Sequence, residues 1–300
     1  MSLPPFVDAH HHLWDLGALH YPWLMARGVR RFFGDPTPIQ RDYRVHDLLA
    51  DAAGLPLAKS VHVQVGVADT DVVAETRWLQ RCADEPAGPG LPHAIVAYCD
   101  LASPAAMEVV AAHRQSANLR GIRQILGRRD DEDRATGSDR LVDEPRFAEH
   151  LAALSALDLA FDLQLVPRQM LRVARLLERV PGLRVALCHC GSPWERSREG
   201  LAAWRDGLQA LAALPHVHCK LSGFGMFDPD WTDASIAPLL EACIEAFGAR
   251  RCMFGSNFPV EKLARPYHAL YAAYDRLTTG LGSEQRQALF AGTAEAFYRI

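Results

Sequence analysis

The chain has 300 residues, of which 49% are hydrophobic and 23% are charged, and these globular proportions exclude a mainly disordered polypeptide. Its 32 Lys and Arg residues are balanced by 36 Asp and Glu residues, which gives a formal charge of −4. This balance argues against nucleic acid or an acidic membrane surface as a partner. We therefore expect the partner to be a small-molecule substrate.

The seven cysteines are an odd number, so at least one is unpaired, as suits a reducing compartment. The sequence contains no run of about 20 uncharged apolar residues that would predict a membrane span. Its first segment, MSLPPFVDAHHHLWD, lacks the basic and apolar regions of a signal peptide. We predict a cytoplasmic protein that does not interact with membranes. The sequence is compatible with a homodimer but does not determine the oligomeric state.

Short apolar runs rich in β-branched residues recur along the whole chain and predict eight strands, at 6–14, 60–67, 93–101, 119–126, 160–166, 184–191, 216–223 and 251–259. Between several of these strands, apolar residues recur at helical spacing and predict helices at 146–157, 169–180, 200–214 and 234–247. Eight strands with room for crossover helices predict an α/β fold, a single distorted (β/α)₈ TIM barrel over residues 1–300. An open doubly wound sheet is the weaker alternative, because no glycine-rich phosphate loop follows the first strand.

The segment between Trp14 and Ser60 is too long for a simple strand-to-helix connection. We expect this extended loop after strand 1 to cover the mouth of the barrel, because long ordered loops of enzymes often form lids or substrate walls.

Histidines are concentrated near predicted strand ends, where the chemistry of this type of barrel gathers. Strand alternation predicts that Asp8, His10 and His12 share one face and that His11 takes the other. His10 and His12, joined by His189 from the sixth strand, can converge on a metal ion or on a reacting carbonyl. The alternative is that some of them are ordinary core or surface histidines.

The motif VDAHHHLW resembles the first-strand HxH signature of the amidohydrolase superfamily, in the amidohydrolase-2 branch of sugar-lactone and pyrone-dicarboxylate lactonases. The segments LRGIRQIL, CHCGSPWERS, CKLSG and CMFGSNFPVEKL match further pieces in the same order over nearly the whole chain. The resemblance implies a TIM-barrel hydrolase that uses His10, His12, His189 and an aspartate at the end of strand eight. In this sequence that last position is Asn257.

The asparagine changes the expected mechanism, because a neutral carboxamide can position water or substrate but cannot accept a proton. The protein either recruits another base, uses a metal-bound hydroxide with His189 as proton acceptor, or has lost hydrolysis. Glu261 is the first candidate for a replacement base, ahead of Asp228 and Glu195, although loop carboxylates of this kind are more often simply solvated.

The fourth predicted strand has no Lys or carboxylate that could bridge two ions, so a two-metal site is not expected. One divalent ion, zinc first, could be held by His10, His12 and His189. Metal-independent catalysis stays equally open, since the resembling branch includes lactonases that work without metal.

Cationic and polar groups at other strand ends are candidates for binding a substrate carboxylate or hydroxyls. These are Arg123, Lys220, Gln64 and Gln164, with Trp14 as a residue that could pack against a ring. The alternative for Arg123 and Lys220 is an ion pair with a barrel carboxylate such as Asp8 or Asp162.

We predict a hydrolase that opens a small carboxylated or polyhydroxylated lactone by attack of water at the carboxyl end of the barrel. Two alternatives stay open. One is a non-oxidative decarboxylase of the same barrel branch, and the other is a non-catalytic binding barrel that has lost its general base.

Overall fold

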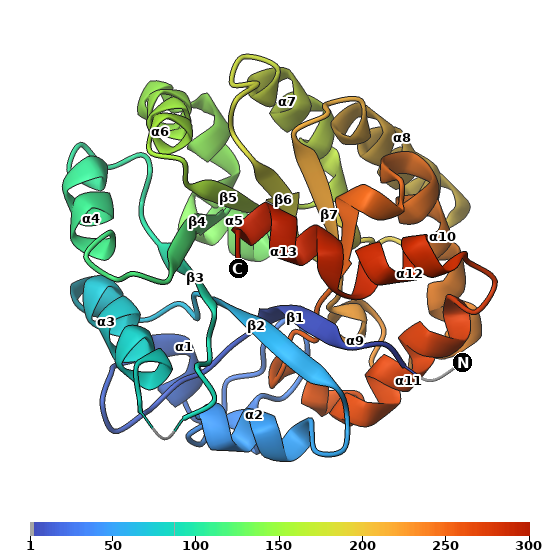
Figure 1. Ribbon diagram of the computed structural model, residues 1–300. Helices are drawn as coiled ribbons and strands as arrows, with labels where there is room; N and C mark the ends of the chain where they lie inside the picture. The colour runs from blue at the N-terminus through green and yellow to red at the C-terminus, as the bar shows by residue number, and fades with distance from the viewer. Residues whose placement is uncertain (1–2, 87) are drawn as a thin grey trace.

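A computed structural model describes residues 3–86 and 88–300, and the strands in these ranges form one parallel sheet of eight in sequential order (Figure 1). The strands are β1 (Phe6–His11), β2 (Leu57–Val63), β3 (Ala94–Tyr98), β4 (Leu119–Ile125), β5 (Ala160–Gln164), β6 (Val185–Leu187), β7 (Val217–Leu221) and β8 (Cys252–Phe254). The sheet closes where β1 meets the segment after β8, since the N–H of Asn257 donates to the carbonyl of His10. The predicted TIM barrel is confirmed.

Helices surround this barrel (Figure 1). Within the described residues they are α1 (Pro22–Met25), α2 (Val45–Asp51), α3 (Val72–Ala83), α4 (Ala106–His113), α5 (Asp130–Thr136), α6 (Pro145–Ala156), α7 (Pro167–Leu177), α8 (Arg198–Ala212), α9 (Phe224–Phe227), α10 (Asp233–Phe247), α11 (Tyr267–Leu277), α12 (Ser283–Gln287) and α13 (Thr293–Tyr298). Four of them, α6, α7, α8 and α10, occupy the predicted helical segments. Throughout the described part of the chain, every helix is too short or too polar to cross a bilayer.

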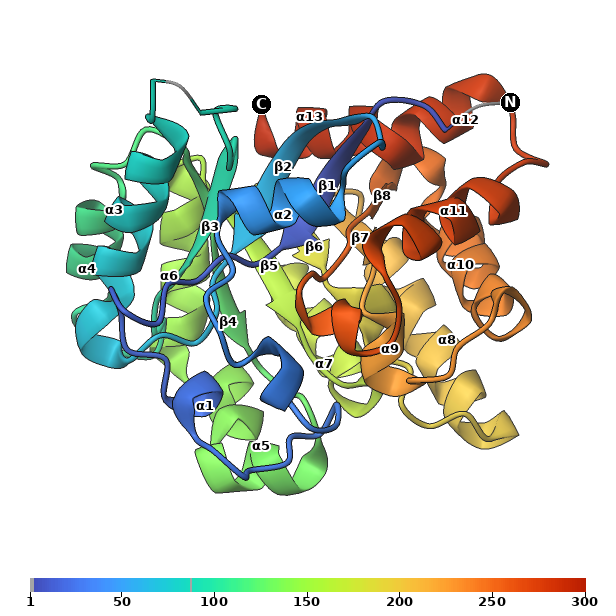
Figure 2. The same ribbon diagram turned by 90° about the horizontal axis from the view of Figure 1, so that it is seen from below.

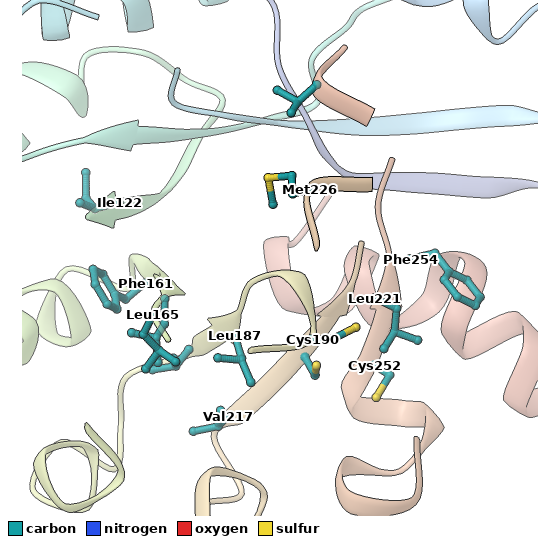
Figure 3. Close-up of a cluster of buried hydrophobic side chains, with 14 of the residues drawn as sticks. Ile122, Phe161, Leu165, Leu187, Cys190, Val217, Leu221, Met226, Cys252 and Phe254 are labelled. Atoms are coloured by element: carbon teal, nitrogen blue, oxygen red, sulfur yellow. The ribbon is translucent and has the colours of Figure 1, made fainter. Parts of the chain in front are cut away.

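Side chains alternate between two apolar layers, as strand geometry requires. The layer between strands and helices contains large residues, and Figure 3 shows Ile122, Phe161, Leu187, Leu221 and Phe254 among them. The barrel interior contains small residues instead, which pack against α13. These are Val7, Ala9, Val61, Val63, Ala94, Val96, Ala160 and Ala186.

Helix α13 lies across the end of the barrel where the strands begin (Figures 1 and 2). Lys59, near the start of β2, donates from Nζ to the carboxylate of Glu295 at 2.7 Å and to the carbonyl of Ile300 at 2.9 Å. The loops that carry α1, α5 and α9 gather at the opposite end (Figure 2). The carboxyl ends of the strands therefore form the mouth of the barrel.

The long segment after β1 forms the expected extended loop. Its base is fixed by a backbone pairing of Trp14 with Tyr43, in which each N–H donates to the other's carbonyl, at 2.8 and 3.0 Å. The segment between them carries α1 and a turn at Arg31–Gly34. This loop supplies part of the cavity wall described below.

The predicted alternation of side chains fails at the end of β1. The register with β2 shifts between Asp8 and His11, so Asp8 does not share a face with His10. Its carboxylate lies in the outer layer, where it accepts hydrogen bonds from Ser256 and from the hydroxyl of Tyr267 on α11. This irregularity turns His10 toward the barrel interior despite its even spacing from Asp8.

Candidate active site

Three histidines from two distant segments converge at the mouth of the barrel. The ring centroid of His10 lies 4.5 Å from that of His189 and 5.1 Å from that of His12, and all three side chains are buried. The structure thus brings together the three histidines that the sequence singled out.

Backbone turns in the left-handed region, rather than strand alternation, orient His189 and Asn257. Strand β6 ends at Leu187, and His189 follows with a φ of 55°. Asn257 follows β8 with a φ of 56°. Such values are uncommon outside glycine and recur at functional sites, where the surrounding structure sustains the strain.

Two glycines leave room for the histidines. A Cβ on Gly223 would lie 2.6 Å from Nδ1 of His189, and a Cβ on Gly255 would lie 2.7 Å from the Cβ of His10. Both distances are shorter than real Cβ contacts. The glycines of the CKLSG and CMFGSN segments are therefore required by close approach to the site.

His12 is oriented by the backbone of β2 and faces Asn257. Its Nδ1–H donates to the carbonyl of Val63 at 2.7 Å, which leaves the lone pair on Nε2. That nitrogen lies 3.2 Å from Oδ1 of Asn257, whose Nδ2 has no partner among the described residues. Two acceptors in contact require either a cation between them or rotation of the amide, which lets Nδ2 donate to His12.

Burial keeps the histidine cluster neutral. It lowers the pKa of His12 to about 3, with the charge of Arg123 as the next cause. The pKa of His10 is lowered well below its usual range, first by burial and then by the charge of Lys220. Neither ring nitrogen of His10 has a hydrogen-bond partner among the described residues. Neutral imidazoles with free lone pairs fit a divalent metal ion, so the chemistry of the donors is suitable.

A second set of donor atoms lies deeper in the barrel, where His10, Asp162 and Cys188 bring one ligand atom each within 4.8 Å of one another. This set is less suited to an ion, because Asp162 is already neutralised by an ammonium group and burial raises the pKa of the Cys188 thiol to about 12. The set His10, His12 and His189 stays a prediction.

Lys220 is not available to substrate. Its Nζ donates to Asp162 at 2.5 Å, and both side chains are fully buried. The hydroxyl of Tyr298 on α13 lies 2.8 and 3.0 Å from the two oxygens of the same carboxylate. The structure therefore corrects the substrate-binding assignment of Lys220 in favour of the alternative ion pair with a barrel carboxylate.

Arg123 faces the cavity. Its guanidinium donates to Oε1 of Gln164 at 3.0 Å and to the backbone carbonyl of Gln64 at 2.5 Å. Arg123 and Gln164 line an inner cavity of about 300 Å³, together with His12, His189 and Asn257. The side chain of Gln64 instead accepts from the N–H of Gly66 at 2.7 Å and does not line this cavity.

Glu261 is turned away from the histidines. Its carboxylate accepts from the N–H of Gly225 at 2.9 and 3.0 Å and from the indole of Trp231 at 2.8 Å. Burial raises the pKa of Glu261 to about 8. The structure does not place it as a replacement base, since it ties the start of α9 to the segment after β8.

Trp14 also lies outside the cavity. It is fully buried and its indole donates to the carbonyl of Arg41 at 2.6 Å, so it anchors the loop rather than contacting a substrate ring.

Two residues that line or support the site were missed by the sequence-based prediction. Ser222 places Oγ 2.9 Å from Nδ1 of His189, and Met226 of α9 lines the inner cavity. Ser222 adjoins Gly223 in the CKLSG segment, so this motif carried a usable signal. The sequence carries no such signal for Met226, because it lies in α9, a helix of only four residues that is too short to show a periodic pattern.

Comparison with known proteins agrees with this architecture. The amidohydrolase family model matches residues 7–300. An uncharacterised protein of Sinorhizobium fredii, y4mH, is 38% identical over the full length of both chains. An L-fucono-1,5-lactonase of Burkholderia multivorans is 34% identical, over 98% of this chain and 96% of its own.

A crystal structure of a Burkholderia multivorans amidohydrolase with bound zinc superposes with a TM-score of 0.82 at 32% identity, over 99% of this chain and all of the other. The family match, the relatives and the barrel with its histidine cluster agree, and the chain belongs to the amidohydrolase family.

Proposed function

We propose that the protein is a lactonase that hydrolyses a small carboxylated or polyhydroxylated cyclic ester. The observation that carries the proposal is the single inner cavity of about 300 Å³ lined by His12, His189, Asn257, Arg123 and Gln164. It combines a cationic anchor, two amides and two imidazoles around one small cavity. The lactonase relative supports the same class of substrate.

Arg123 and Gln164 are suited to binding the substrate. A guanidinium binds a carboxylate through two parallel hydrogen bonds, and Gln164 can donate to a hydroxyl or ring oxygen. Arg123 is held in place by Gln164 and by the backbone carbonyl of Gln64, just after β2, so the entropy cost of ordering its side chain is already met in the free protein.

His189 is the residue we assign to proton transfer. With Nδ1–H donating to Ser222, its Nε2 lone pair is left for the cavity that the residue lines. Burial, followed by the charge of Arg123, holds the pKa of His189 well below its usual range, so it is unprotonated at neutral pH.

The reaction balances with these groups. The oxygen of water bonds to the lactone carbonyl carbon while one of its protons passes to Nε2 of His189. The ring C–O bond then breaks, and the same proton passes to the departing alkoxide to give the hydroxy acid. Asn257 orients the water or the carbonyl, and its amide neither gains nor loses a proton in the reaction. A divalent ion, when held by His10 and His12, would supply electrophilic polarisation of the carbonyl.

The test is a panel of sugar-acid and aromatic-acid lactones, assayed by acid release with and without added zinc or manganese. We expect hydrolysis of at least one lactone, and loss of that activity in His189→Ala with retained folding. If no lactone is opened under either condition, the proposal is wrong. Release of carbon dioxide from an aromatic or enoic acid would instead support the decarboxylase alternative, and ligand binding without turnover would support the binding barrel.

A further inference from the structure

A second, larger cavity adjoins the inner one. This outer cavity has a volume of about 1070 Å³, more than three times the 300 Å³ of the inner cavity. The two share lining residues, among them Phe32, Phe33 and Met226, so they lie next to each other. A lactone ring bound in the inner cavity would leave the outer one to another part of the ligand.

An unbroken series of aromatic rings forms one wall of the outer cavity. Phe33 meets Phe32 at 4.9 Å between ring centroids, Phe32 meets Trp194 at 5.4 Å, and Trp194 meets Phe227 at 4.7 Å. All these pairs are edge-to-face and all four residues are only half-buried, so ring surface is left for a ligand. The rings come from the loop after β1, the loop after β6 and α9.

The formal charges of the side chains around this cavity sum to zero. Three cations, Arg30, Arg31 and Arg129, are balanced by Asp35, Asp131 and Glu132. Two of the arginines are already paired, Arg129 with its near neighbour Asp131 at 2.5 Å and Arg31 with Glu132 of another segment at 3.2 Å. A neutral group therefore suits the cavity better than an anion, and the rim offers donors and acceptors for hydroxyls.

We propose that the outer cavity binds a second, neutral sugar ring attached to the lactone, which stacks its C–H face on the aromatic wall. This inference rests on the proposed lactonase function and deepens it, because it names glycosylated lactones as the preferred substrates. In this assignment Trp194 and Phe227 determine specificity without touching the reacting carbonyl, since they line the outer cavity and not the inner one.

The test compares the 1,5-lactone of a disaccharide aldonic acid with the lactone of its own reducing-end sugar, and with the same lactone bearing a phenyl substituent. We expect kcat/KM to be at least tenfold higher for the disaccharide lactone. Trp194→Ala should reduce this ratio roughly tenfold, since it removes one stacking ring. Trp194→Leu guards against misfolding, because it retains apolar volume and should still lower the ratio.

The matched control is Val29→Ala, on the same loop as Phe32, because Val29 is 45% exposed and lines neither cavity. The ratio should not change in this variant. Equal kcat/KM values for both sugar lactones, unaffected by Trp194→Ala, would overturn the inference, as would a preference for the phenyl lactone alone.

Calorimetry separates the two proposals. The disaccharide aldonic acid should bind more tightly than the monosaccharide acid, and Trp194→Ala should remove the difference. If neither lactone is hydrolysed but this pattern of binding is seen, the proposed function fails and the outer sugar site stands. If hydrolysis occurs without the binding difference, the proposed function stands and the outer sugar site fails.

Discussion

The side-chain amide of Asn257 lies against the imidazole of His12, with Oδ1 3.2 Å from Nε2. Asn257 is 1% exposed, so any charge placed there is shielded very little by water. This contact makes position 257 the most direct test of how the site works.

We predict that Asn257→Asp lowers kcat/KM for the native lactone by about tenfold or more at neutral pH. A buried carboxylate beside His12 would draw a proton onto the imidazole and would repel the carboxylate of the substrate. The measurement is a steady-state assay, with folding checked by thermal melting. A faster Asn257→Asp enzyme would instead show that position 257 is a vacated site for a general base.

Arg123→Lys should raise KM and lower kcat/KM by roughly 100-fold for a carboxylated lactone. Lysine cannot reproduce the two-point contact or span from Gln164 to the backbone of Gln64. Arg250→Lys is the matched control, since Arg250 is 86% exposed on the outside of the barrel. Equal values of KM and kcat/KM in the two variants would show that Arg123 does not bind the substrate.

Glu261→Gln should change kcat by less than about twofold at pH 7. The folded carboxyl has a pKa of about 8, so it is mainly protonated at pH 7, and glutamine mimics that form. If Glu261 were the general base, the same substitution would cost on the order of 100-fold or more. The activity assay therefore decides between these two roles.

The pH dependence of stability gives an independent check on Glu261. Its pKa is raised from 4.5 in the unfolded chain to about 8 in the folded one. Between these values only the unfolded state has lost the proton, so stability falls as pH rises, by up to about 1.4 kcal/mol per pH unit. Glu261→Gln should flatten the slope of the free energy of unfolding over pH 5–8. Part of the slope should remain, because Glu75 carries the same shift.

Lys220→Met should destabilise the fold by about 3–5 kcal/mol, because it leaves the carboxylate of Asp162 buried without its cation. The double variant Lys220→Met/Asp162→Asn should recover most of that loss, since the hydroxyl of Tyr298 can still bond to the amide. Urea unfolding measures both. Equal midpoints for the single and double variants would mean that the unpaired carboxylate of Asp162 is not the cause of the destabilisation.

The barrel could be predicted from sequence because the strands are short, mainly buried runs bounded by turn residues, and such runs can be recognised without knowing which segments they contact. The convergence of His10, His12 and His189 followed from the rule that strand ends meet at one face. The direction of His189 did not follow, because its backbone leaves the strand for a left-handed turn, which no period-two pattern encodes.

Other site details required contacts between segments far apart in the chain. The shift of register after Asp8 depends on pairing with β2 and on Ser256, which lies 248 residues away. The orientation of Glu261 depends on Trp231, on a separate loop. The pairing of Lys220 with Asp162 could be anticipated from the sequence, because both residues lie on predicted strands of one barrel and their ion pair was one of the stated alternatives.

The helix across the barrel floor has a consequence for how the protein is made. The carboxylate of Asp162, which pairs with Lys220 beneath the histidines, is capped by Tyr298. During synthesis the ion pair can be sealed from water only after residue 298 has left the ribosome, when all eight strands have already been translated. A premature stop a few codons upstream would therefore release a chain that keeps every catalytic candidate but lacks the Tyr298 hydroxyl that covers the ion pair beneath them.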